Sequence, residues 1–146
     1  MKRVGCVGLA MMLYLFLVGM GDMGNPGSVQ VPKTKANYSA TIVDLSDLAT
    51  RVERFSFDGE THLSGRMGDA DVSVTFDRID TIIFVLHEDT LTAEVKLKDG
   101  ETAHVVMNKK TACYGQFAYG GYKISAVNIK SVKVHGKVLR GDIEPS

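Results

Sequence analysis

An aromatic cluster is the feature of this sequence whose residue types most suggest contact with a partner. The segment YGQFAYGGY sets four aromatic side chains among glycines, and tyrosine beside flexible glycine makes a good contact surface for peptide or sugar. Phe117 and Tyr119 are expected to share one face of an extended strand, so burial in a core is the alternative that the alternation favours. The candidate binding residues are Tyr114, Phe117, Tyr119 and Tyr122.

Groups that bind metals or carry out acid–base chemistry are scattered along the chain. His62, His87, His104 and His135 stand at no ligand spacing from one another or from Cys113, whereas metal and catalytic sites need converging groups. We therefore expect no metal site, no cofactor and no catalytic residue.

The segment GDADVSV begins as a calcium-binding loop does, with oxygens at the alternating positions Asp69, Asp71 and Ser73. It then departs from such a loop, because Val74 stands where the sharp turn needs glycine and Asp80 replaces the longer bidentate glutamate. A tight turn leading into a strand explains the segment with fewer assumptions.

Cys113, in TACYG, is predicted to be a buried strand cysteine, the usual state of an unpaired one. A reactive thiol or an intermolecular disulfide is the alternative. The sequence contains no GxSxG elbow for a serine nucleophile and no glycine loop of the kind that cradles phosphate.

The first 21 residues have the arrangement of a secretory signal peptide. Two basic residues precede an apolar run over residues 4–18, and Gly19 and Gly21 supply small residues where a signal peptidase reads them. Cleavage is predicted after Gly21, which removes Cys6 and leaves Cys113 as the single cysteine. A retained membrane anchor is the alternative, although the uncharged run is at the lower limit of a bilayer span and no positive cluster follows it.

The rest of the chain divides by composition. Residues 22–37 contain glycine and proline and little that is apolar, which predicts a flexible linker. No proline occurs from Tyr38 to Arg140, as suits a continuous ladder of strands. The expected organisation is 1–21 signal peptide, 22–37 linker, 38–89 first β unit, 90–140 second β unit and 141–146 C-terminal tail.

An internal repeat is indicated by residues 65–84 and 115–134, which align without a gap at an offset of 50. Gly65 falls on Gly115, and the alternation of apolar and polar positions agrees between the two segments. Each copy is predicted to hold a strand, a short turn and a second strand.

The mature chain shows no sustained helical periodicity, and we expect an all-β fold. Residues 81–86 are apolar on both faces, which predicts an interior strand covered on each side. Residues 45–50, capped by Asp44 or Ser46, are the one segment where a helical turn is an alternative. Further strands are predicted at 38–43, 51–57, 93–97 and 102–107, the last two joined by a turn at 98–100.

The second copy, with VKLKDGETAHVV and YKISAVNIKSVKV, resembles the five-stranded SH3-like or Sm-like small barrel. The resemblance covers about 45 residues and consists of strand rhythm. It implies two related antiparallel β units, as small barrels or as one merged β-sandwich, with a short helical turn before a last strand. A fold of this kind does not determine a function.

Charge separates the two halves, although the 146 residues balance 17 Lys and Arg against 17 Asp and Glu. Residues 38–89 hold four basic and eleven acidic residues, a net charge of −7, whereas residues 90–146 hold nine and five, a net charge of +4. We interpret these as two solvated faces; the alternative is that one half faces the other or that molecules associate head to tail. The mature net charge of −2 argues against a nucleic-acid partner.

These observations predict an exported (periplasmic or secreted), non-enzymatic β-rich interaction or assembly module of the cell envelope. The expected partner is an envelope protein, or a second copy through the oppositely charged halves, with no nucleic acid and no stable membrane span after cleavage. The alternatives are a small-ligand or metal-binding exported protein, and a hydrolase or isomerase with a dispersed site.

Overall fold

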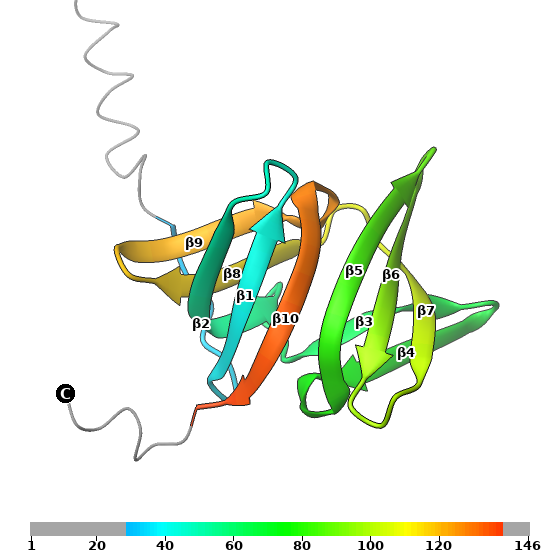
Figure 1. The fold of residues 1–146 in the computed structure, drawn as a ribbon, viewed down its shortest axis with the longest axis horizontal. Coiled ribbons are helices and arrows are strands. Elements are labelled where there is room, and N and C mark those ends of the chain that lie inside the picture. The colour runs from blue at the N-terminus through cyan, green and yellow to red at the C-terminus, as the bar shows by residue number, and fades with distance from the viewer. Residues whose placement is uncertain (1–28, 139–146) are drawn as a thin grey trace, which may run out of the picture.

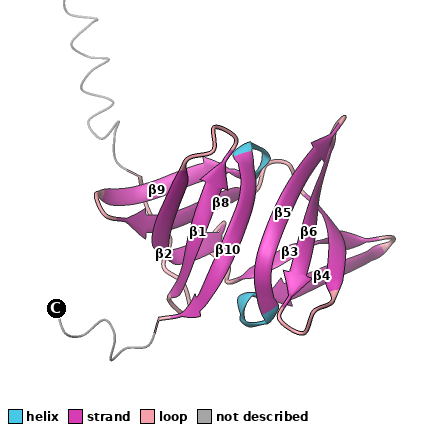
Figure 2. Ribbon diagram, viewed as in Figure 1, coloured by secondary structure: helices cyan, strands magenta, loops and turns pink. Residues whose placement is uncertain are grey.

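The computed structural model describes residues 29–138, which form an all-β fold, as the alternation predicts (Figure 2). The predicted signal peptide, residues 22–28 of the expected linker, residues 139–140 of the expected second β unit and the expected C-terminal tail lie outside the described residues. The elements are β1 (Tyr38–Asp44), β2 (Ala49–Phe57), β3 (His62–Met67), β4 (Ala70–Thr75), η1 (Phe76–Arg78), β5 (Ile79–His87), β6 (Thr90–Leu97), β7 (Thr102–Met107), β8 (Ala112–Phe117), β9 (Gly120–Ser125), η2 (Ala126–Asn128) and β10 (Ile129–Lys137), where η marks a 3₁₀ turn.

The ten strands form one continuous, strongly curved antiparallel sheet in the order β4-β3-β7-β6-β5-β10-β1-β2-β8-β9 (Figure 1). Pairing of β5 with β10 joins its two halves at the centre. Within the described part of the chain, β4 and β9 are the end strands, so the β3–β4 and β8–β9 hairpins lie at opposite ends of the molecule.

The element bounds recur at a spacing of 50 residues. The series β3, β4, η1 and β5 begins at 62, 70, 76 and 79, and the series β8, β9, η2 and β10 begins at 112, 120, 126 and 129. Two further strands outside the repeat complete each half of the sheet. These are β6 and β7 for the first series and β1 and β2 for the second. Strands β1 and β2 therefore pair with β10 and β8 instead of with β3–β5, and the expected boundary at residues 89 and 90 falls within the β5–β6 hairpin.

The register shows which residues occupy equivalent positions in the two halves of the sheet. Ile82 of β5 faces Val95 of β6, and Val132, fifty residues later, faces Ile42 of β1. Val95 and Ile42 are thus equivalent at an offset of 53. The same offset relates the β6–β7 register to the β1–β2 register.

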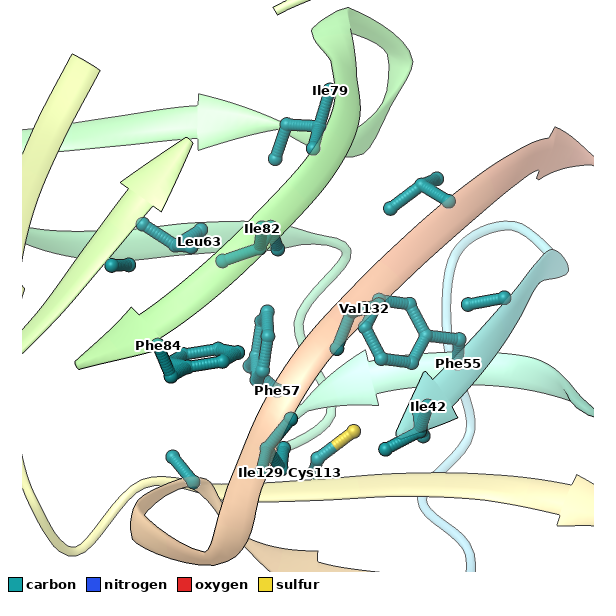
Figure 3. Close-up of a cluster of buried hydrophobic side chains, with 14 of the residues drawn as sticks. Ile42, Phe55, Phe57, Leu63, Ile79, Ile82, Phe84, Cys113, Ile129 and Val132 are labelled. Carbon is teal, nitrogen blue, oxygen red and sulfur yellow. The ribbon is translucent and has the colours of Figure 1, made fainter. Parts of the chain in front are cut away.

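An aromatic cluster occupies the centre of the core (Figure 3). The ring of Phe76 in η1 stacks on Phe55 with centroids 4.8 Å apart and meets Tyr38 and Phe57 edge-on at 5.3 and 5.7 Å. Phe57 in turn meets Phe84 at 6.2 Å. The cluster therefore joins β1 and β2 to η1 and β5, which lie in the two halves of the sheet.

Tyr38 provides the polar link in this cluster. Its hydroxyl donates a 2.8 Å hydrogen bond to Oδ1 of Asp77 in η1. Burial of the phenol, followed by its hydrogen bond to the Asp77 carboxylate, raises the pKa of Tyr38 to about 12. The neutral phenol thus ties the beginning of β1 to the turn that precedes β5.

The alternative of a helical turn over residues 45–50 is wrong. Oδ1 of Asp44 accepts hydrogen bonds from the backbone N–H groups of Ser46 and Leu48, at 2.9 and 3.1 Å. This side-chain turn reverses the chain at once, and β2 begins at Ala49. The Ser46 hydroxyl and these N–H groups lower the pKa of Asp44.

The expected cover on both faces of residues 81–86 is also not found. Strand β5 is central in the sheet, but Val85 and Leu86 are each 50% exposed. Pairing of β5 with β10 extends only from Thr81 to Ile83, so the last part of β5 projects beyond its neighbour. Because Val85 and Leu86 point to opposite faces, both faces of the strand are in contact with solvent there.

Gly65 and Gly115 hold equivalent positions in β3 and β8, where a neighbouring strand crosses closely. A Cβ on Gly65 would lie 2.5 Å from Cγ1 of Val105 and closer still to the carbonyl oxygen of Val106. A Cβ on Gly115 would lie 2.7 Å from Cβ of Val52. The shared glycine in the repeat alignment therefore has a packing reason, since only glycine admits this approach.

We expect Gly65→Ala to destabilise the protein by about 1–3 kcal/mol, because the methyl group would press on backbone that has no room to move. Urea unfolding measures the change. The matched control is Ser64→Ala, an exposed neighbour on the other face of β3, which should stay within about 0.5 kcal/mol of wild type. An unchanged urea midpoint for Gly65→Ala would show that β3 and β7 do not approach so closely.

Candidate functional site

The β8–β9 hairpin carries all four candidate aromatic residues, but on different sides. Tyr122 lies opposite Gly115 and packs with Phe117 against the core, whereas Tyr114 lies opposite Lys123 on the other face. There the Lys123 ammonium lies 5.6 Å from the centre of the Tyr114 ring. The four residues therefore do not form a single surface.

Tyr119 is 90% exposed in the turn between β8 and β9, so its assignment to the core is wrong. The strand ends at Phe117, and the alternation that placed both rings on one buried face stops with it. The Tyr119 ring meets Phe117 edge-on at 5.5 Å, and Phe117 meets Tyr122 at 6.0 Å. An exposed tyrosine thus stands on a half-buried aromatic base.

A groove of about 450 Å³ lies beside this base, between β2 and the end of β8. It combines a guanidinium, a carboxylate and a carboxamide with the Phe117 ring. Such a set offers hydrogen bonds in both directions beside an apolar surface. The lining residues are Arg51, Val52, Glu53, Gln116, Phe117 and Ala118.

A larger groove of about 680 Å³ lies at the other end of the sheet, over β3, β4 and the end of β7. Its walls hold a loose ion pair, with Arg66 Nε 3.9 Å from Oδ1 of Asp71. Arg66 also donates to the backbone carbonyl of Asp69, so the segment considered as a calcium loop faces a guanidinium. The lining residues are Ser64, Gly65, Arg66, Asp71, Val72, Ser73, Val106, Met107 and Asn108.

Sequence reasoning missed this second groove because its walls come from three strands. In the sequence, Asp71 and Ser73 stand out only as oxygen ligands and Arg66 only as a charge. One difference in the sequence could have indicated the groove. Residues 116–123 contain aromatic side chains, whereas their counterparts at residues 66–73 contain none.

Each of the four histidines has its own polar neighbour. His104 lies 3.1 Å from Glu94, and His135 lies 2.8 Å from the Thr41 hydroxyl. Partial burial, with Arg51 nearby, lowers the pKa of His135. Among residues 29–138, no three His, Cys, Asp or Glu side chains gather as a metal-ligand group.

Cys113 is fully buried in β8, which confirms the prediction of a buried strand cysteine (Figure 3). Burial, and to a lesser degree the negative charge of Asp58, raises the pKa of the Cys113 thiol well above its usual value. The thiolate needed for nucleophilic or redox chemistry is therefore disfavoured.

The charged halves meet within one molecule through lysine–aspartate pairs. Lys133 of β10 donates a 2.7 Å hydrogen bond to Asp80 of β5 and lowers the pKa of that carboxyl. The side chains in these pairs are substantially exposed, so each pair contributes little to stability. The pairs are Lys109–Asp89, Lys130–Asp47, Lys133–Asp80 and Lys137–Asp77.

Comparison with known proteins identifies a family to which the chain belongs. A family model with the description "Uncharacterised protein" matches residues 34–137, more than half of the chain. No curated protein and no solved structure matches. In the range that the structure describes, no helix has the length and apolar character needed to cross a membrane.

We expect Cys113 of the folded protein to react with a thiol reagent about two orders of magnitude more slowly than Cys113 of the protein unfolded in urea. Burial keeps the reagent away from the sulfur, and it also disfavours the reactive thiolate form. Mass spectrometry of the Cys113 peptide follows the reaction at this site alone. Ser125→Cys, at an exposed position of β9, is the control that should react at once. Rapid labelling of Cys113 in the folded chain would show that β8 opens readily.

Proposed function

We propose that this protein is an exported, non-enzymatic interaction or assembly module of the cell envelope. The chain belongs to the family whose model spans residues 34–137. The observation that carries the proposal is Tyr119, 90% exposed at the tip of a hairpin whose base is anchored in the core. Exposed tyrosines with few degrees of freedom are common anchors of protein interfaces.

The surroundings of Tyr119 favour a protein partner. Phe117 holds the Tyr119 ring in place at 5.5 Å, so little side-chain entropy is lost on binding. Arg51, Glu53 and Gln116 of the adjacent groove offer hydrogen bonds to a peptide backbone. The proposed recognition surface consists of Tyr119, Phe117 and this groove.

The end strands offer a second mode of contact. One side of β4 and one side of β9 carry no paired strand among the described residues, and an extended segment of a partner adds to such an edge. Their charges differ, with Asp71 on β4 and Lys123 on β9. This difference supports self-association as the form that assembly takes.

We further propose that the sheet consists of two related five-stranded units of the SH3-like or Sm-like kind. The unit β8, β9, β10, β1 and β2 has the strand order of β3–β7 with its elements permuted in the chain. The constant offsets of 50 and 53 residues and the glycines Gly65 and Gly115 support this relationship.

A small polar ligand is the second candidate for the groove beside Phe117. Its volume of about 450 Å³ lies in the usual range for small-molecule sites, and its polar groups flank an aromatic ring. Stabilisation of the protein against heat by sugars or short peptides would identify such a ligand.

We expect the exported protein to begin at Asp22, because Gly19 and Gly21 suit a signal peptidase. Intact-mass measurement of the protein from the envelope or medium tests this. The control is Gly21→Leu, which should leave the leader attached because the large side chain blocks the cleavage position. A wild-type protein that keeps residues 1–21 would contradict the proposed export.

We expect Tyr119→Ala to weaken partner binding by roughly 30-fold, the usual effect of truncating an interface anchor. The tagged protein is used to recover partners from the envelope fraction at low and high salt, and the affinity of the recovered partner is then measured. Tyr119→Phe should keep most of the binding, because its ring is retained.

The matched control is Tyr114→Ala, the same change at a residue of β8 that does not line the groove, which should leave binding unchanged. The urea midpoint of Tyr119→Ala should equal that of wild type, since the side chain is exposed. Recovery of the wild-type protein alone, as a monomer, would overturn the proposed function.

A further inference from the structure

Residues 29–37 of the chain cover part of the outer face of the β8–β9 hairpin and run to the start of β1 (Figure 1). Val29 lies directly over Gly121, where a Cβ would be 2.6 Å from the Val29 carbonyl oxygen. At the other end of the segment, Oδ1 of Asn37 accepts a 2.7 Å hydrogen bond from the backbone N–H of Arg54. The described part of the expected linker therefore lies against the sheet.

The two positions that this segment contacts have counterparts in the other half of the sheet. Gly121 of β9 corresponds to Asp71 of β4 at the offset of 50. Arg54 of β2 stands in the bulge that follows Glu53, and Glu53 corresponds to Val106 of β7 at the offset of 53. Asp71 and Val106 both line the groove of about 680 Å³. The groove thus occupies, over β3, β4 and β7, the place that residues 29–37 occupy over β8, β9 and β2.

We propose that this groove is a docking site for an extended segment of a partner protein that carries a small apolar residue followed by basic residues. The proposal rests on the proposed function and names the surface and the kind of partner. The chain itself shows that a segment of such chemistry suits the equivalent face, since residues 29–37 read VQVPKTKAN.

The lining of the groove supports this choice of segment. Val106, 42% exposed, offers an apolar floor, while Ser64 and Ser73 offer hydrogen bonds to a peptide backbone. A volume of about 680 Å³ is ample for several residues of an extended peptide.

Asp71 distinguishes this groove from the covered face. Gly121 leaves room for the backbone of Val29, whereas the Asp71 carboxylate, with its side chain 93% exposed, points where that backbone would lie. An incoming segment must therefore offer the carboxylate a partner, which a lysine does. Residues 62–107, which form β3–β7, hold four basic and nine acidic residues, and this net charge of −5 also attracts a basic segment.

The test uses a labelled synthetic peptide, VQVPKTKAN, titrated into the purified exported protein at low salt. We expect saturable binding that weakens about tenfold in Asp71→Lys, because a carboxylate facing lysine becomes a like charge. The matched control is Asp69→Lys, the same change of net charge at a residue outside the groove lining, which should alter affinity less than twofold. The peptide VQVPETEAN should bind Asp71→Lys more tightly than it binds wild type.

Absence of saturable binding to the wild-type protein, or equal effects of Asp71→Lys and Asp69→Lys, would overturn the proposal. The second result would mean that the peptide displaces residues 29–37 from the other face or responds to net charge only. Recovery of a partner that depends on Tyr119 would leave the proposed function intact in either case, so the two failures are distinguishable.

Discussion

The stacking of Phe76 on Phe55 is the contact on which the rest of the structure depends. Phe55 belongs to β2 and Phe76 to η1, and Tyr38, Phe57 and Phe84 surround the pair from both halves of the sheet. Full burial of a large apolar side chain contributes roughly 1.5–3 kcal/mol, so this cluster holds the curved sheet closed around one core. The two lysine–aspartate pairs that join the halves of the sheet, Lys133–Asp80 and Lys137–Asp77, are exposed and follow from that closure.

Closure of the sheet in this way sets the two hairpins β3–β4 and β8–β9 at its opposite ends (Figure 1). Gly65 and Gly115 each admit the close approach of a neighbouring strand to a hairpin, which gives the two ends a similar scaffold. Their chemistry differs, because one end presents Tyr119 above aromatic residues and the other an open groove with Asp71. A single framework therefore carries two unlike candidate surfaces.

The candidate site was found from the sequence only in part. The spacing of aromatic residues and glycines in YGQFAYGGY singled out the hairpin, but the exposure of Tyr119 depends on where β8 ends. A strand end is set by the register with its neighbours, which local alternation does not contain. The groove over β3, β4 and β7 was missed for a related reason, since Arg66 and Met107 are brought together by a crossing of strands distant in the chain.

Local order along the chain was determined by the sequence itself. Side chains of a strand alternate with a period of two, and turns need particular residues, so β4, β6, β7, the offset of 50 and the burial of Cys113 followed from short segments. The partners of β1 and β2 were decided only by the tertiary structure. These strands have the same alternation whether they pair with β3–β5 or with β8 and β10. The choice is made by the burial of Tyr38, Phe55 and Phe57 against Phe76, a contact between segments that only the folded chain brings together.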